Sequence, residues 1–199
     1  SYTVTFDANG GSTDKKNTSV TYGAAYGELP SASRTGYRFD GWYTDKTAGT
    51  EITEKMLVDV DEDTILYAHW SAMQYQVSFD SNKGSGSSTP TEAQAIKVTY
   101  DGFYENLPEV SRDGYTFNGW YTAKDGGSRV DSSDRVTVAE EQTLYAHWTA
   151  NSYKVTFHTG EGSFANGTVS KVISQTYDST YQFPDEPTRS NYIFQGWYT

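Results

Sequence analysis

Residues 36–44 read GYRFDGWYT, and this stretch organises the whole chain. It returns at residues 114–122 as GYTFNGWYT and at residues 191–199 as NYIFQGWYT. Self-similarity at a nearly fixed period indicates a repeat protein, which overrides the one or two domains that length alone would suggest. We therefore expect repeat 1 at residues 1–70, repeat 2 at 75–148 and repeat 3 at 153–199, with short linkers at 71–74 and 149–152.

Composition predicts strands. The 199 residues include 17 Tyr, 9 Phe and 5 Trp, and aromatic and β-branched side chains favour β-structure. The 18 Gly, several in Gly-Gly or Asn-Gly pairs, are typical of turns. The spacing of Ile52 and Met56 allows one short helical turn. These features predict a fold that is mainly β or α+β.

The net charge, the hydrophobicity and the cysteine content argue against several classes of function. The formal net charge of −11 repels phosphate backbones and anionic lipids, so we expect no nucleic-acid partner. No apolar run reaches about 18 residues, so we expect no membrane insertion in this segment. The absence of Cys excludes disulfides, thiol catalysis and thiolate metal sites. Since the chain opens directly at a repeat start, we expect it to be a fragment of a longer protein.

Alternating apolar residues mark the first strand of each repeat. Tyr2, Val4 and Phe6 have the period of a half-buried strand, and residues 75–79 and 153–157 repeat the pattern. Residues 64–70 and 143–148 close the two complete repeats with another strand. Together with the GWYT motif, these segments predict a repeat core that consists of Tyr2, Val4, Phe6, Phe39, Trp42, Leu66, Trp70, Phe79, Phe117, Trp120, Leu144, Trp148, Phe157, Phe194 and Trp197.

The glycine before the motif tryptophan affects the face of the strand on which the indole lies. Strict alternation would place Trp42 on the face opposite Phe39. A glycine inside a strand often marks a bulge or a close backbone approach. We predict that Gly41 turns the indole towards the core or lets another segment pass against it. A row of sugar-stacking tryptophans is the alternative, but a small unit without disulfides depends on such burial for its stability.

The sequence supports no reactive site. His69 and His147 have no His or Cys companion, so we expect solvated strand residues rather than metal ligands. Residues 59–63 resemble the start of a calcium loop but lack its Gly and final Glu. Neither a supported Ser-His-Asp triad nor a phosphate-binding loop is present. We expect no catalytic residue, no metal and no cofactor.

Two sets of recurring residues remain. The first is an arginine three positions before the motif tyrosine, which we expect to cover an aromatic ring or to pair with an acid such as Asp40 or Glu51; its members are Arg34, Arg112 and Arg189. The second is a set of outward tyrosines that could bind a protein or glycan ligand, namely Tyr43, Tyr67, Tyr121 and Tyr145.

The ordered motifs Y-x-V-x-F, N-G-G, L-P, G-Y-x-F-x-G-W-Y-T and T-x-L-Y-A-H-W resemble the Listeria–Bacteroides repeat family, which includes the B repeats of internalin B-type bacterial surface proteins. The resemblance covers nearly the whole chain, and the complete set of motifs occurs twice, in repeats 1 and 2. It implies tandem β-grasp-like (ubiquitin- or SUMO-like) units in an elongated array. It also implies a secreted or wall-anchored bacterial protein, and it supplies no catalytic residues.

Two functional hypotheses follow. The first is a non-catalytic stalk or spacer in adhesion at the bacterial cell surface. The alternative is a glycan- or host-protein-binding module that uses the four tyrosines. Repeat 3 departs from the pattern, since Asn191 replaces the first Gly of the motif and the closing strand is missing. We expect either a continuation of the chain or a sheet edge that pairs with another chain.

Overall fold

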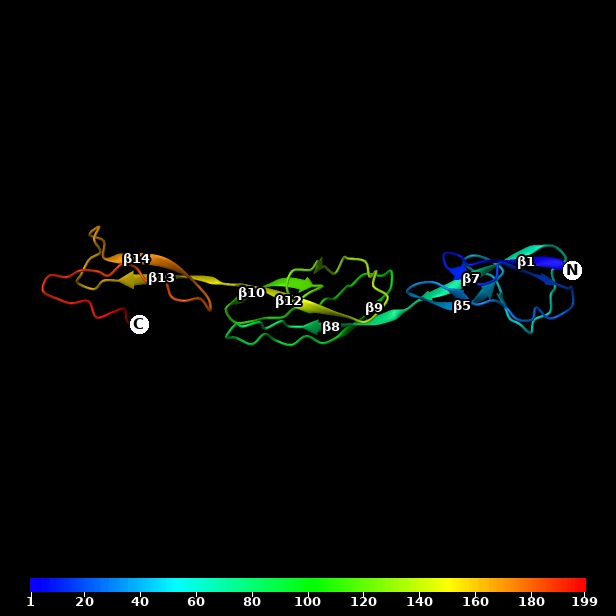
Figure 1. Cartoon of the computed structure of the whole chain (residues 1–199), viewed down its shortest axis with the longest axis horizontal. Helices are drawn as coiled ribbons and strands as arrows, with labels where there is room; N and C mark the ends of the chain where they lie inside the picture. The colour runs from blue at the N-terminus through cyan, green and yellow to red at the C-terminus, as the bar shows by residue number, and fades with distance from the viewer. The chain divides into compact units, whose positions relative to one another are not determined.

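The structure is a computed structural model that describes all residues 1–199, and it consists of strands without any helix (Figure 1). The strands are β1 (Tyr2–Asp7), β2 (Ser12–Thr13), β3 (Asn17–Val20), β4 (Ala32–Ser33), β5 (Tyr37–Tyr43), β6 (Glu51–Ile52), β7 (Thr64–Ala72), β8 (Gln74–Asp80), β9 (Ile96–Thr99), β10 (Tyr115–Tyr121), β11 (Arg129–Val130), β12 (Gln142–Ala150), β13 (Ser152–His158) and β14 (Ser170–Thr176). No element is a helix of the length and hydrophobicity that crossing a membrane demands.

The chain divides into two compact units. The first comprises Ser1–Ser78, Ala95–Leu107 and Asp131–Thr143, and the second comprises Phe79–Gln94, Pro108–Val130 and Leu144–Thr199.

The mainly β part of the predicted fold class is confirmed, but the helical turn near Met56 is wrong. The backbone there pairs with an extended segment instead: Met56 O accepts from Tyr26 N at 3.0 Å, and Val58 N donates to Ala24 O at 2.8 Å. These bonds occupy backbone groups that a helix would use for its own ladder.

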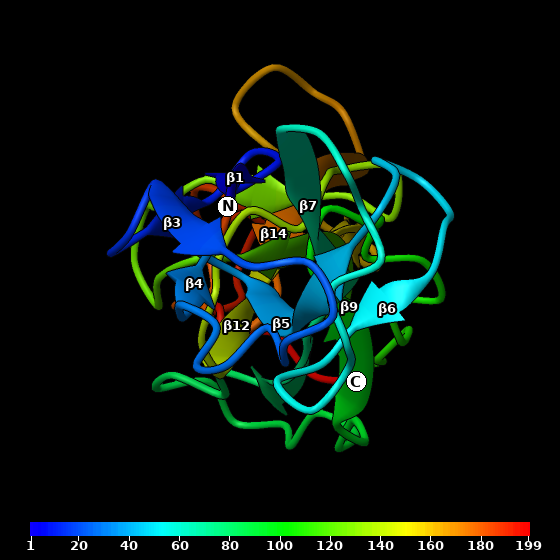
Figure 2. The same cartoon turned by 90° about the vertical axis from the view of Figure 1, so that its right-hand side faces the viewer.

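Repeat 1 forms one five-stranded sheet in the order β3-β1-β7-β5-β6. The first strand, β1, runs parallel to the last, β7, and all other pairs are antiparallel. Figure 2 labels these strands. The alternation expected from the sequence orients one face inwards, where the buried apolar cluster consists of Val4, Phe6, Val20, Tyr26, Trp42, Ile52, Val58, Leu66 and Ala68.

A β-bulge interrupts β5 between Phe39 and Gly41, so that Asp40 has no partner in the ladder with β7. The extra residue returns Trp42 to the face of Phe39, and the two ring centroids lie 5.4 Å apart. Gly41 has φ 140°, a region that side chains disfavour. Trp42 is 1% exposed and its Nε1 donates to Pro30 O at 2.8 Å. The predicted bulge is confirmed.

Repeat 2 follows the same plan, with its strands in the order β11-β10-β12-β8-β9. Its bulge lies between Phe117 and Gly119, where φ is 122°. Trp120 is 1% exposed, and its Nε1 donates to Pro108 O at 2.7 Å. The same motif therefore produces the same local structure twice.

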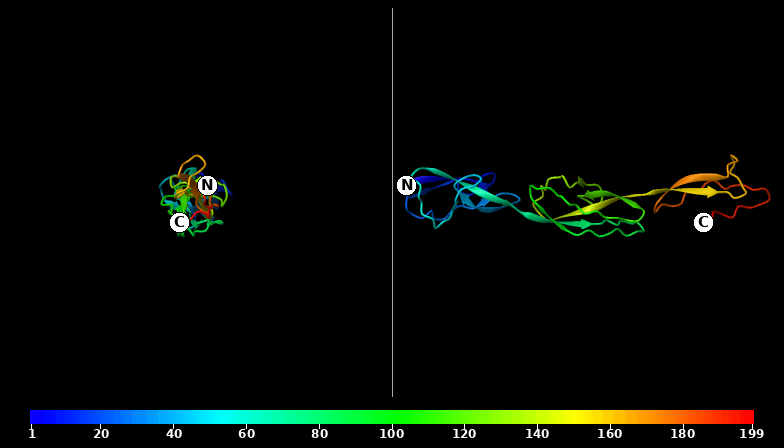
Figure 3. Two further views of the ribbon diagram at one scale, coloured as in Figure 1. Left: turned by 90° about the vertical axis from the view of Figure 1, so that its left-hand side faces the viewer. Right: turned by 180° about the vertical axis from the view of Figure 1, so that it is seen from behind.

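Repeat 3 contains only a two-stranded antiparallel ribbon of β13 and β14, and the chain beyond it is drawn without strands (Figure 3). The ring of Trp197 lies 5.1 Å from that of Phe157, whereas Ile193 and Tyr198 are 85% and 84% exposed. Completion of this repeat by another chain stays a prediction.

The predicted core residues fall into two groups. The buried ones are Val4, Phe6, Trp42, Leu66, Phe79, Trp120, Leu144 and Phe157. The half-buried ones are Tyr2, Phe39, Trp70, Phe117, Trp148, Phe194 and Trp197.

The expected linkers are largely strand. Strand β7 extends to Ala72 and β8 starts at Gln74, so only Met73 lies between them. Likewise, only Asn151 separates Ala150 of β12 from Ser152 of β13.

Candidate functional site

A polar cluster recurs at one end of both complete repeats, where the turn after the first strand meets the loop after β5 or β10. In repeat 1, Asn9 Nδ2 donates to Lys46 O at 3.1 Å and to Ala68 O at 3.0 Å. The Asn9 amide donates to Asp7 Oδ1 at 2.9 Å. Asn9 has φ 46°, which asparagine tolerates better than most residues. One side chain thus ties the turn to a loop and to the last strand.

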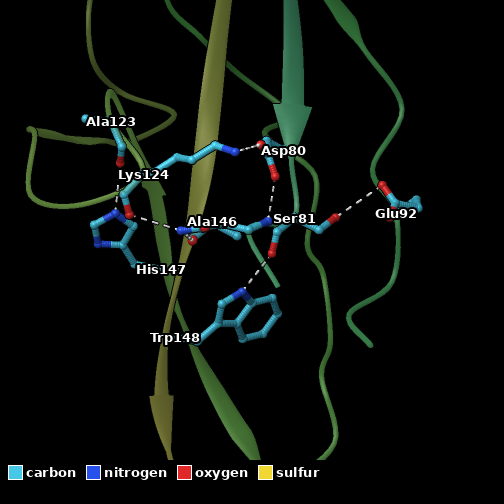
Figure 4. A network of polar contacts seen from close by, with 9 residues as sticks. Asp80, Ser81, Glu92, Ala123, Lys124, Ala146, His147 and Trp148 are labelled. Atoms are coloured by element: carbon cyan, nitrogen blue, oxygen red, sulfur yellow. Dashed lines mark hydrogen bonds and ion pairs between the residues drawn. The ribbon is translucent and has the colours of Figure 1, made fainter. Parts of the chain in front are cut away.

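Repeat 2 contains the same arrangement (Figure 4). Asn82 Nδ2 donates to Lys124 O at 3.0 Å and to Ala146 O at 2.9 Å, and its amide donates to Asp80 at 2.8 Å. From the sequence, both glycine-containing segments are ordinary turns, and this role of the asparagine is not predicted. The signal was the shared Asp-x-Asn spacing, which repeat 3 replaces with His158-Thr159-Gly160.

The histidines belong to this cluster. His69 Nε2 lies 2.8 Å from Asp45 O, and its ring stacks on Tyr43 with centroids 3.9 Å apart. Since a carbonyl only accepts hydrogen bonds, Nε2 carries the proton. His147 likewise lies 2.9 Å from Ala123 O and stacks on its own motif tyrosine. The two histidines are strand residues as expected, but each ring is only partly exposed, because the loop after β5 or β10 folds back over the strand.

A lysine covers the remaining tyrosine of each cluster. Lys46 Nζ lies 5.4 Å from the ring centroid of Tyr67 and 3.8 Å from the Asp7 carboxylate. Both contacts are long, and the lysine is exposed, so they contribute little to stability.

In repeat 2 the corresponding ion pair is tighter, at 3.1 Å between Lys124 Nζ and Asp80. The hydrogen bond with Asp80 raises the pKa of Lys124. Desolvation opposes ionisation of Asp80, yet the amide of Asn82 and the ammonium of Lys124 together lower its pKa. Lys124 Nζ also lies 5.7 Å from the ring centroid of Tyr145.

All four candidate ligand-binding tyrosines are half-buried. Tyr43 and Tyr121 stack on histidines, and Tyr67 and Tyr145 lie under lysines. An open hollow of about 440 Å³ lies beside the cluster of repeat 2 and is lined in part by Asn82, Lys124, His147 and Trp148. No group of three or more His, Cys, Asp or Glu side chains is placed to hold a metal ion.

The recurring arginines stack on the motif tyrosines. The Arg34 guanidinium carbon lies 3.9 Å from the ring centroid of Tyr37, and the other two copies lie at 3.8 Å. The predicted ring contact is therefore confirmed. Pairing of Arg34 with Asp40 is wrong, because Asp40 pairs with Arg38 at 2.9 Å, its neighbour on the same face of the strand before the bulge.

The similarity of this chain to known proteins extends over all three repeats. The chain matches the Listeria-Bacteroides repeat domain over residues 2–69, 75–147 and 153–199. The chain belongs to this family. The resemblance seen in the sequence is thereby confirmed.

Similar proteins carry the Listeria-Bacteroides repeat in longer chains. Internalin H of Listeria monocytogenes is 39% identical over 155 residues, which are 75% of this chain and 25% of that protein. A protein of Evansella cellulosilytica with a provisional membrane-protein name is 32% identical over 200 residues, 100% of this chain and 28% of the relative. The chain thus spans about a quarter of the length of these relatives.

Proposed function

We propose that this Listeria-Bacteroides repeat chain is a non-catalytic module of a bacterial surface protein, and that it serves as a stalk or spacer in adhesion. The proposal rests on one observation: the recurring polar and aromatic side chains are used for contacts inside their own repeat. In both complete repeats the asparagine, histidine, lysine and tyrosines make their polar and ring contacts with groups of their own repeat.

The surface location is part of the same proposal. Its support is the repeat family together with the relatives, one of which is named Internalin H and another as a membrane protein. Protease treatment of intact cells that express the full-length parent protein should release peptides of this chain. Release only after cell lysis would contradict a surface location.

We further propose that each complete repeat is a reduced β-grasp. The supporting features are the parallel pairing of β1 with β7 and the strand order β3-β1-β7-β5-β6, with the first and last strands adjacent inside the sheet. Residues 21–31, which lie between β3 and β4, form turns and extended backbone instead of a helix. Circular dichroism of the chain should give a β spectrum without a helical component.

Small-angle X-ray scattering of the full chain tests the spacer role. A spacer gives a pair-distance distribution with a long tail, whereas a compact globule of the same mass gives a symmetric one. A symmetric distribution at all concentrations would contradict the proposal.

The glycan- or protein-binding alternative rests on the part of each tyrosine ring that stays accessible. A glycan array with the full chain, alongside Tyr67→Ala and Tyr145→Ala variants, separates the two functions. Binding that both substitutions abolish, with the fold intact, would favour the alternative. The spacer proposal expects no tyrosine-dependent binding.

A further inference from the structure

The junction between repeats 1 and 2 is pinned on both sides of its single irregular residue. Met73 N donates to Gly36 O in repeat 1 at 2.9 Å, and Met73 O accepts from Tyr100 N in repeat 2 at 2.9 Å. All three residues belong to the first compact unit. Both backbone groups of the connecting residue are therefore used, one on each repeat.

Side chains close the same junction. Tyr37 Oη donates to Asp101 Oδ2 at 2.6 Å. The ring of Tyr37 meets that of Tyr100 edge to face, with centroids 5.6 Å apart, while Arg34 covers the ring of Tyr37. The hydrogen bond is charge-assisted, a class stronger than neutral hydrogen bonds. Repeat 1 thus supplies an Arg-x-Gly-Tyr corner, and repeat 2 supplies a Tyr-Asp turn.

The junction between repeats 2 and 3 reproduces the backbone bridge within the second compact unit. Asn151 N donates to Gly114 O at 2.8 Å, and Asn151 O accepts from Tyr177 N at 2.8 Å. Asn151 and Met73 differ in side chain, so the bridge depends on the backbone and not on the residue type.

The side-chain contacts recur as well. Tyr115 Oη donates to Asp178 Oδ2 at 2.8 Å. The rings of Tyr115 and Tyr177 lie edge to face at 5.6 Å, and Arg112 lies 3.8 Å from the Tyr115 centroid. Ser87, in the loop inserted in repeat 2, adds a backbone hydrogen bond to Asp178 at 2.8 Å.

A glycine is required where the two halves meet. A Cβ built on Gly36 would lie 2.3 Å from ring carbons of Tyr100, and one built on Gly114 would lie 2.4 Å from those of Tyr177. Both glycines also have positive φ, 78° and 79°. The corner therefore needs glycine for space as well as for conformation.

We propose that the Arg-x-Gly-Tyr corner of one repeat and the Tyr-Asp turn of the next form a clasp that holds successive repeats in a fixed arrangement and selects which repeats can be neighbours. This inference goes beyond the spacer role and does not depend on it. Two independent junctions with different connecting residues and different flanking loops arrive at one geometry, which supports a specific device over incidental contact.

The remaining corner and turn show the selectivity. Arg189 covers Tyr192 as in the other two corners, and Tyr192 is 64% exposed. However, Asn191, with φ 62°, takes the place of the glycine. By analogy with Gly36 and Gly114, where an added Cβ would meet the partner ring, its side chain would collide with a partner tyrosine. In repeat 1, Tyr22 is followed by Gly23, which lacks the carboxylate. Each of these halves thus misses one requirement of the clasp.

Spin labels test the clasp in the full chain. Because the chain has no cysteine, nitroxides can be attached at Lys55→Cys and Ser133→Cys, two exposed positions in repeats 1 and 2. Double electron–electron resonance then measures the distribution of distances between the labels. We expect a narrow distribution for the parent chain.

Three substitutions remove different parts of the clasp. Tyr37→Phe deletes the hydroxyl. Asp101→Gly deletes the carboxylate and suits the positive φ of 60°. Gly36→Asn introduces the residue of repeat 3, which tolerates positive φ but fills the space of the Tyr100 ring. Each should broaden the distribution at least two-fold, and the Tyr37→Phe/Asp101→Gly double variant should be no broader than either single one, because both delete the same bond.

The controls are Tyr22→Phe and Asp61→Gly, which change the same residue types at exposed positions of repeat 1. Neither should alter the width. An unchanged width in Tyr37→Phe and Asp101→Gly, with circular dichroism showing an intact fold, would overturn the proposal. So would a parent distribution as broad as those of the variants.

Discussion

Truncation of the motif tryptophan, Trp42→Ala, should remove a large part of the stability of repeat 1. The indole is 1% exposed and lies 4.8 Å from the ring of Phe6 and 5.4 Å from that of Phe39, measured between centroids. Its Nε1 donates to Pro30 O. The substitution therefore removes a packed ring and the donor of a buried hydrogen bond at once.

The magnitude follows from both losses. A buried Trp removes about 150–250 Å² from water, worth at most about 4–6 kcal/mol at ~25 cal/mol/Å². Measured Trp→Ala substitutions in cores cost about 3–5 kcal/mol, and the unpaired Pro30 carbonyl acts in the same direction. A unit of roughly 70 residues has a stability of about 3.5–10 kcal/mol. We expect a loss of about 3–5 kcal/mol, while Trp42→Phe should lose less because it keeps a ring.

Hydrogen exchange measured by mass spectrometry across a urea series resolves this loss by repeat. Peptides from β1 and β7 should lose protection at lower urea concentration in Trp42→Ala than in the parent chain. Leu57→Ala, at a side chain 63% exposed, is the matched control and should change stability by less than about 0.5 kcal/mol. A loss below about 1 kcal/mol in Trp42→Ala would refute a core role for the indole.

Three further perturbations test the bulge, the polar cluster and the second junction. Gly41→Ala should cost about 1–3 kcal/mol in urea unfolding, because φ 140° strains any side chain; a neutral result would show that the bulge relaxes easily. Asn82→Gly keeps the backbone freedom but deletes two side-chain hydrogen bonds, so it should cost roughly 2 kcal/mol, and a loss confined to fraying of the turn would contradict the tie to β12. At the second junction, hydrogen bonds from the Ser87 side chain and amide lower the pKa of Asp178, so its contribution is present above the unfolded value of about 4 and disappears as the pH falls through the lowered folded value. The hydrogen bond to Asp178 raises the pKa of Tyr115, so that contribution is present below about pH 10 and disappears as the pH rises through the raised value. Protection of the β13 amides from hydrogen exchange, measured against pH, should therefore decrease at both the acid and the alkaline end. A Tyr115→Phe variant that still lost protection at the alkaline end would contradict the role given to Tyr115.

The sequence predicts the fold best where local pattern and burial agree. The alternation of Val4 and Phe6 and the glycine before Trp42 were enough to place a strand and a bulge. The parallel pairing of β1 with β7 joins residues about 60 positions apart, and no local pattern specifies such a contact.

The site was harder to predict than the fold. His69 looked solvated because strand alternation ignores loops that return over a sheet, and the loop after β5 does so. The role of Asn9 was hidden because asparagine in a glycine-rich segment is also an ordinary turn residue. The contact of Tyr37 with Asp101 lies between repeats, so reading each repeat alone could not reveal it.

Repeat 2 carries both halves of the junction, the Tyr100-Asp101 turn and the corner with Gly114 and Tyr115. An in-frame duplication of residues 74–151 would therefore join one copy to the next through the same two halves. Repeats 1 and 3 each lack a half, at Gly23 and Asn191 respectively. Of the three repeats in this chain, repeat 2 is thus the one whose duplication keeps both halves of the junction, which makes it a natural unit for lengthening such an array by gene duplication.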